Sequence, residues 1–359
     1  MAINKYMQEA IDRDYSIDWK SYGTFDYFMQ QRKPPLEGRP ISVRDNYKRT
    51  LWGQKPYWIP VSFFDATYFT PDPVQEHPIP GNEDGFDYWG VDWIYDKTIA
   101  GSMVRPGTRV ITDFAKWKEQ VDVPDLSLLD FKTDGAKMQK ILDPDRPTLV
   151  FIPEGIFERL HELMPFDETL LTFYEEPELL WDFFDMMADY KINCVKPVFE
   201  YYGQIDGVYY SDDWGTQRAG FFSNDMFDEQ LMPHEKKFIQ YVKSTGRYFE
   251  LHSCGRNMQY VPEMIEMGAD MWTPQSTCND LDYLFDNFNE KITFTFPVDI
   301  PAGADEQTVK EAVHDFVEKY GKNGRIMASI MAPPETAQVA RDELYNYSLQ
   351  YYNKLYGRE

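Results

Sequence analysis

The chain has 359 residues, of which 60 are acidic and 36 are basic, so its formal net charge is −24. A surface this negative repels a phosphate backbone, and we therefore expect no nucleic-acid partner. A hydrophobic content of 43% is enough for a packed core. No run of about 18 apolar residues is present, so we expect no membrane span.

The N-terminal segment, residues 1–50, is polar and lacks the basic-then-apolar pattern of a secretory leader. It is predicted to form one or two helices that lead into the main fold. Three cysteines are too few for a disulfide framework. Together these features predict a cytoplasmic protein.

Seven short apolar runs alternate with amphipathic helical stretches through the rest of the chain. Their apolar residues are consecutive, as in parallel strands that helices cover. The runs are residues 57–65, 147–155, 206–215, 247–255, 269–275, 291–299 and 324–334. Repeated strand–helix units predict a parallel sheet.

The segment 66–110 interrupts this rhythm, because it is rich in proline, glycine and tryptophan. It is predicted to be a long loop with a hairpin, and long ordered loops are usually functional. A less distinct eighth strand is expected within 75–110. We therefore predict a single α/β domain over 1–359, with a helical lead-in at 1–50 and a (β/α)8 TIM barrel over 51–359 that carries the insertion. A doubly wound open sheet is the alternative, but no glycine-rich phosphate fingerprint follows any strand.

The strand predicted at 247–255 carries a histidine and a cysteine at its end. Positions i and i+2 of a strand face the same side, and in a barrel the strand ends line the site. His252 and Cys254 therefore point together towards the predicted mouth, where imidazole nitrogen and thiolate sulfur suit tetrahedral zinc. From spacing alone, two ordinary core residues are an equal alternative; the position at a strand end favours a metal.

Acidic residues end two other predicted strands. Asp212 and Asp213 follow one strand, with Gln217 just beyond, and Glu154 ends another. Such carboxylates are either helix caps and solvated groups, or groups that orient a ligand, bind substrate or act as acids. We assign Asp213 and Glu154 as candidate catalytic acids, and Asp212, Gln217 and Tyr210 as candidate substrate contacts.

Three further residues have two interpretations. Cys278 follows the next predicted strand after that of His252, and it is either a small buried residue or a further metal ligand. Trp89 and Trp93, in the 66–110 insertion, are either core or the walls of a substrate pocket. No serine-hydrolase, zincin, P-loop or CxxC motif is present, so those chemistries lack support.

Several stretches occur in the order seen in the uroporphyrinogen decarboxylase superfamily. They are "ISVRDNYKRTLWGQKPYWIPV", "DYWGVDWIY", "GVYYSDDWGTQ", "ELHSCGRNMQYVPEMIEMGADMWTPQ" and "KITFTFPVDIPAG". The chain resembles this superfamily from about Pro40 onward, most closely its corrinoid-dependent methyltransferase branch, whose members are (β/α)8 barrels. The "HSCG" and "DDWGTQ" elements are the specific part of the resemblance.

The resemblance implies a zinc site held by an H-x-C pair and a later cysteine near the last strand. His252 and Cys254 match the pair, but the last predicted strand offers Ser329 and Met331 in place of a cysteine. The third ligand is then Cys278, Glu154 or an aspartate, or zinc is not bound in that way. The arginine motif with which the decarboxylases clamp porphyrinogen carboxylates is not evident in residues 28–46.

Fewer thiolate ligands leave zinc a stronger Lewis acid, which suits an ether leaving group better than a thiolate nucleophile. We therefore expect a methyl group to move between a small, methoxylated aromatic substrate and the cobalt of a corrinoid on a partner protein. Three alternatives stay open: transfer from methyl-corrinoid to a thiol such as coenzyme M, decarboxylation of a tetrapyrrole, and a non-catalytic corrinoid- or tetrapyrrole-binding role.

Overall fold

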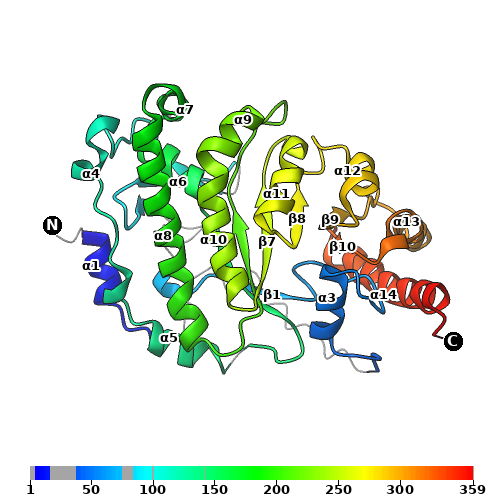
Figure 1. Cartoon of the computed structure of the whole chain (residues 1–359). Helices are drawn as coiled ribbons and strands as arrows, with labels where there is room; N and C mark the ends of the chain where they lie inside the picture. Colours follow the sequence, from blue (N-terminus) through cyan, green and yellow to red (C-terminus); the bar gives the residue numbers. More distant parts are fainter. Residues whose placement is uncertain (1–4, 17–37, 75–83, 99–100, 141, 359) are drawn as a thin grey trace.

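A computed structural model of the chain describes residues 5–16, 38–74, 84–98, 101–140 and 142–358. Its centre is a curled, seven-stranded parallel sheet in the order β1-β5-β6-β7-β8-β9-β10 (Figure 1). The strands are β1 (Thr67–Phe69), β5 (Thr148–Ile152), β6 (Gly207–Ser211), β7 (Tyr248–Ser253), β8 (Met271–Pro274), β9 (Thr293–Pro297) and β10 (Ile326–Ser329). Six of the seven predicted strands are confirmed, because each of β5 to β10 lies inside one of the predicted apolar runs.

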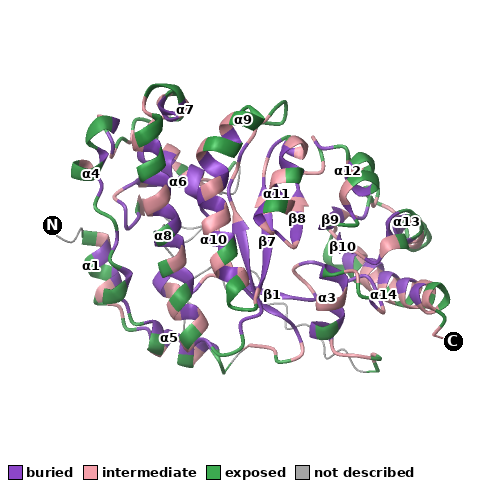
Figure 2. Ribbon diagram, in the orientation of Figure 1, coloured by how far each residue is buried: buried purple, intermediate pink, exposed green. Residues whose placement is uncertain are grey.

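Helices follow each strand from β5 onward, which confirms the predicted strand–helix repeat. The helices are α1 (Lys5–Ile11), α3 (Val43–Leu51), α4 (Trp117–Gln120), α5 (Phe131–Met138), α6 (Ile156–Leu163), α7 (Phe166–Glu175), α8 (Pro177–Tyr201), α9 (Asn224–Met226), α10 (Met232–Ser244), α11 (Val261–Met267), α12 (Leu281–Phe288), α13 (Glu306–Tyr320) and α14 (Pro334–Tyr356). In Figure 2 the strands are buried, whereas the helices are exposed on their outer faces. None of the described helices combines the length and the apolarity needed to cross a bilayer.

Helix boundaries follow local signals in the sequence. The Ser223 hydroxyl accepts a hydrogen bond from the Met226 N–H and caps α9. Helix α11 ends at Gly268, whose φ of 100° is the left-handed conformation that glycine adopts readily. The predicted helical lead-in contains α1 and α3, and its residues 17–37 lie outside the described part of the chain.

The predicted strand at 57–65 is not formed. Within it only Val61 pairs, in an isolated parallel bridge with Ala328 of β10. The chain then turns sharply, because the Asp65 N–H donates to the Val61 carbonyl at 2.7 Å and Phe63 has a φ of 60°. Strand β1 therefore begins only at Thr67 and pairs with β5.

The insertion forms its own small sheet. Strands β2 (Gly85–Phe86), β3 (Asp92–Asp96) and β4 (Gly101–Val104) are antiparallel to one another and separate from the parallel sheet. This confirms the predicted hairpin. The eighth parallel strand expected within 75–110 is absent from the described residues of that segment, because they pair among themselves.

Candidate functional site

The interior of the curled sheet opens to solvent at the carboxyl ends of its strands. On six strands an inward-facing residue is buried, and the residue two positions later on the same face is partly exposed. These pairs are Leu149 and Phe151, Tyr209 and Ser211, Glu250 and His252, Met271 and Thr273, Thr295 and Pro297, and Met327 and Ser329. The second members form one layer, hereafter the floor, which lies where this fold class places its active sites.

Three possible metal ligands meet at the floor. One ligand atom from each of Asp213, His252 and Cys254 lies within 4.8 Å of the other two, and all three residues are partly exposed. The His252 Nε2 is 3.2 Å from the Cys254 Sγ. The Cys254 N–H donates to the Asp213 Oδ1 at 2.6 Å. Hereafter these three residues are the triad.

The orientation of His252 fits a metal ligand. Its Nδ1 lies 2.8 Å from the Thr273 carbonyl oxygen. An Nδ1–H donated to that oxygen leaves the Nε2 lone pair facing Cys254, as in metal-bound histidines whose other nitrogen is held by a carbonyl. One nitrogen, one sulfur and one carboxylate oxygen are a donor set that zinc accepts, and three protein ligands leave a fourth position open.

The environment of Cys254 also fits a cation. Burial, and secondly the Asp213 carboxylate, raise the pKa of the Cys254 thiol to about 12. The thiolate therefore needs a positive charge close to its sulfur, and a divalent metal at the triad supplies one.

The loops that follow β6 and β7 are locked together beneath the triad. The Trp214 N–H donates to the Ser253 hydroxyl at 3.0 Å, and the Arg256 N–H donates to the Thr216 carbonyl at 2.8 Å. A Cβ on Gly255 would lie 2.2 Å from the carbonyl oxygen of Gly215, and Gly255 has a φ of 96°. Glycine is therefore needed where the two loops touch.

Asp212 and Tyr210, predicted to contact substrate, instead support the structure behind the triad. Asp212 is fully buried; its carboxylate accepts from the Phe157 and Glu158 N–H groups at 3.1 and 2.9 Å. The Tyr210 hydroxyl accepts from the Ile156 N–H at 2.9 Å. Both residues thus fix the start of α6 against β6 and face away from solvent.

The start of α6 also carries the acidic residues near the triad. Glu154, a predicted acid, is 8% exposed. Glu158, which sequence reasoning missed, is partly exposed, and its pKa is raised well above the usual value by burial and then by the charges of Asp213 and Asp212. Burial and these two charges therefore favour the protonated form of Glu158. Its place on the first turn of a helix that follows a strand end is the signal that marks it.

The two tryptophans proposed as pocket walls are in the core. Trp89 is 2% exposed and packs edge-on against Tyr190 of α8, with ring centroids 4.7 Å apart. The Trp93 Nε1–H donates to Asp87 at 3.1 Å. Both hold the insertion to the rest of the protein, because Asp87 also accepts a 2.6 Å ion-pair contact from the buried Arg159 of α6.

Two other predicted site residues are not members of the triad. Cys278 is not among the three clustered ligands; its Sγ lies 3.6 Å from the Gln275 Oε1. Gln217 is exposed in the loop after β6.

Aromatic rings lie at the floor and just beneath it, but they are not those of Trp89 and Trp93. Phe63, Tyr68 and Phe151 surround Tyr209, with ring centroids 5.5, 5.2 and 5.4 Å from its own. The Tyr209 ring lies nearly parallel to that of His252, at 6.5 Å and 16°. Because side chains alternate between the two faces of a strand, the strands predicted at 147–155 and 206–215 allow Phe151 and Tyr209 to be placed on the inward face.

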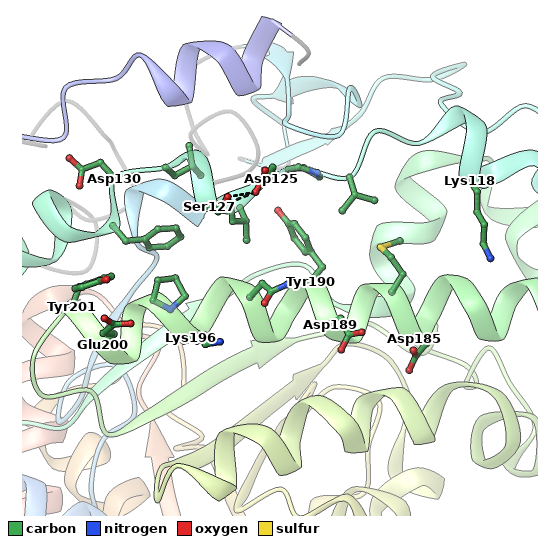
Figure 3. Close-up of a pocket in the computed structure, with 18 of the residues that line it drawn as sticks. Lys118, Asp125, Ser127, Asp130, Asp185, Asp189, Tyr190, Lys196, Glu200 and Tyr201 are labelled. Carbon is green, nitrogen blue, oxygen red and sulfur yellow. Dashed lines mark hydrogen bonds between the residues drawn. The ribbon is translucent and has the colours of Figure 1, made fainter. Parts of the chain in front are cut away.

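A large groove lies elsewhere on the protein. It has a volume of about 1020 Å³ and runs between α8 and the segment 117–132 (Figure 3). Asp185, Asp189, Tyr190 and Lys196 line it from α8, and no triad residue is among its lining residues. The triad is therefore selected as the candidate site by its chemistry and not by the size of a cavity.

Comparison with known proteins gives a family and a fold. Residues 89–337 match the family described as uroporphyrinogen decarboxylase (URO-D). Among solved structures, the chain is similar to a methyltransferase from Methanosarcina mazei, with 13% identity and a TM-score of 0.62 over 86% of this chain and 99% of that chain. At this identity the likeness concerns the fold.

Other matches are weaker. A Xaa-Pro dipeptidase with bound methionine is 13% identical, with a TM-score of 0.27 over 62% of this chain and 48% of its own. A Group II chitinase catalytic domain from Ostrinia furnacalis is 11% identical, with a TM-score of 0.30 over 70% of this chain and 68% of its own. Neither likeness carries an argument. No curated protein matches the chain.

Proposed function

The chain belongs to the uroporphyrinogen decarboxylase family, and from this premise we propose that it is a zinc-dependent methyltransferase. It moves a methyl group from a small methoxylated aromatic substrate to the cobalt of a corrinoid on a separate protein. The observation that carries the proposal is the clustering of Asp213, His252 and Cys254 within 4.8 Å at the strand ends. The similarity in fold to a protein described as a methyltransferase supports it.

In this proposal the sheet closes into a barrel; of the eight strands of a (β/α)8 fold, seven are present in the described residues. The segment before β1 bridges β10 at Val61, while β1 itself pairs with β5. One interrupted strand then links the two edges of the seven-stranded sheet. The floor then lies at the bottom of the open end of the barrel, and the triad lies at the side of that opening.

The composition of the triad supports the proposed direction of transfer. A zinc ion held by one thiolate, one imidazole and one carboxylate would supply a Lewis acid that polarises an ether oxygen. The chain's own residues hold this arrangement: Thr273 orients His252, and the Asp213 carboxylate accepts the Cys254 N–H. Asp213, predicted as an acid, takes the role of third ligand in this proposal.

The transfer step breaks one bond and forms another. The bond between the methyl carbon and the ether oxygen breaks, and both of its electrons stay on the oxygen. A carbon–cobalt bond forms with both electrons supplied by Co(I). The departing oxygen takes a proton from the Glu158 carboxyl, because burial and the charges of Asp213 and Asp212 raise the pKa of Glu158 and favour its protonated form. Glu154, the other acidic residue at this helix start, is more deeply buried than Glu158.

The test mixes the purified, zinc-loaded protein with a reduced corrinoid protein and methoxyarenes such as 2-methoxyphenol. We expect the Co(I) absorption to be replaced by that of methyl-cobalt, and His252→Ala to abolish the change. Cys278→Ser is the matched control, because it removes a thiol outside the triad. Turnover of methyl-cobalt with a thiol, without any reaction of methoxyarenes, would reverse the assigned direction.

A further inference from the structure

We propose that Phe63 determines the specificity of the floor for an aromatic ring: its side chain is the surface against which the ring of the methoxyaryl substrate packs. This inference rests on the proposed function and names the residue that selects its substrate class. Three observations on Phe63 support the inference: its unfavourable backbone conformation, the position of its ring and the partial exposure of its side chain.

The backbone of Phe63 is held in the left-handed region. Of the residues that the structure describes, the non-glycine residues with positive φ are Lys55 and Phe63. Lys55 lies in an exposed turn, whereas Phe63 is bulky and points into the fold, where a positive φ is a genuine outlier. Such conformations persist where the surrounding structure imposes them, and they concentrate at ligand sites.

A tight turn imposes this conformation. The Phe64 and Asp65 N–H groups both donate to the Val61 carbonyl, at 3.1 and 2.7 Å. The Val61 N–H in turn donates to the Asp65 carboxylate at 2.9 Å. The turn interrupts the chain just before β1 and directs the Phe63 side chain over the interior of the sheet.

The ring of Phe63 adjoins the ring that faces the triad. It packs on Tyr68 with centroids 4.4 Å apart and meets Tyr209 edge-on at 5.5 Å and 75°. Tyr209 lies beside His252. Tyr68 and Tyr209 are buried, but Phe63 and Phe151 are partly exposed. These two rings therefore present aromatic surface to a ligand whose methyl group reaches the triad.

A planar aromatic ring is the ligand that fits this surface. Aromatic rings pack on one another in offset or edge-to-face arrangements at centroid distances of about 4.5–7 Å. A substrate bearing several carboxylates fits poorly, because Asp213 and the acidic start of α6 lie close by. Phe63 thus favours a small methoxyarene over a tetrapyrrole polyacid.

The test separates ligand contact from core packing. Phe63→Gly removes the ring and at the same time relieves the positive φ, because glycine adopts that conformation without cost. Phe64→Ala is the matched control: it removes a ring from the same turn, and that ring lies against Arg341, 4.4 Å from its centroid, away from Tyr209. The dissociation constant of 2-methoxyphenol for the zinc-loaded protein is measured by ligand-observed NMR without any corrinoid protein, and the melting temperature is measured for each variant.

We expect Phe63→Gly to raise the dissociation constant about three- to tenfold, the effect of one lost aromatic pair, without lowering the melting temperature. Phe63→Tyr should restore binding, and Phe64→Ala should leave it unchanged. A lowered melting temperature with unchanged binding would show that the ring only packs the core, and it would overturn this inference alone. No binding of methoxyarenes by the wild type would overturn the proposed substrate class together with it.

Discussion

The Nε2 atom of His252, near the end of β7, lies 3.2 Å from the Sγ of Cys254, the first residue after that strand. These two atoms are close because the strand repeats every two residues, so the contact is encoded locally. The third member of the triad, Asp213, reaches them from the neighbouring strand, since Ser211 pairs with His252 in the register of β6 and β7. Each side chain therefore has a separate and testable part in the proposed metal site.

Removing a triad side chain should remove the metal. His252→Ala and Cys254→Ser should purify with far less than one zinc per chain, and Asp213→Asn should weaken zinc binding. Cys278→Ser, the control, should keep the wild-type content because its sulfur is not among the clustered ligands. Elemental analysis and competition with a chelator measure both quantities. Equal zinc content in all four variants would rule out the triad as the binding site.

Breaking the ion pair between Asp87 and Arg159 should destabilise the protein strongly. Both side chains are 0% exposed and lie 2.6 Å apart. Asp87→Asn leaves a guanidinium without its full counter-charge in the core, and losing one partner of a buried pair costs about 3–5 kcal/mol. The free energy of unfolding in urea measures the loss.

The control for that experiment is an exposed pair. Arg109 and Glu168 are 36% and 41% exposed, so Arg109→Ala should destabilise the protein far less than Asp87→Asn does. Similar losses for the two variants would mean that the insertion is not anchored through Asp87.

Stability should depend on pH through Glu250. This carboxyl accepts hydrogen bonds from the Tyr47 and Tyr68 hydroxyls at 2.7 and 3.0 Å, yet burial raises its pKa from 4.5 to about 8. Between these values the folded chain holds a proton that the unfolded chain has lost. The contribution of Glu250 is therefore complete below pH 4.5 and is lost as the pH rises to about 8.

Glu250→Gln removes this titration. Relative to the wild type, the variant should gain up to about 1.4 kcal/mol of unfolding free energy per pH unit across that window. Urea unfolding at several pH values measures the difference, and the exposed residue Glu290 provides the control substitution Glu290→Gln. Parallel curves for the wild type and Glu250→Gln would contradict the assignment.

The local part of the fold could be predicted from the sequence. Short runs of consecutive apolar residues place six strands correctly, because such signals act over a few residues. The H-x-C pair belongs to the same class of signal. The strand predicted at 57–65 is wrong because its apolar residues are typical of a strand. The turn at Phe63 that replaces it depends on backbone hydrogen bonds, which composition does not reveal.

Non-local contacts account for the rest. Trp89 and Trp93 are core residues because Asp87 meets Arg159, which is 72 positions away along the chain. Asp212 is a helix support and not a substrate contact because β6 ends beside the start of α6. Asp213 joins the triad through the pairing of two strands. Pairings of this kind are set by tertiary packing, and one sequence alone does not state them.

The contact between Gly215 and Gly255 restricts how a substrate enters. The loops after β6 and β7 are fastened to each other, so this side of the mouth is rigid. The opposite side of the mouth is more open. The segments after β9 and β10 are more exposed there, and Met331 is 90% exposed. Under the proposed function, the protein that carries the corrinoid would approach over this more exposed side.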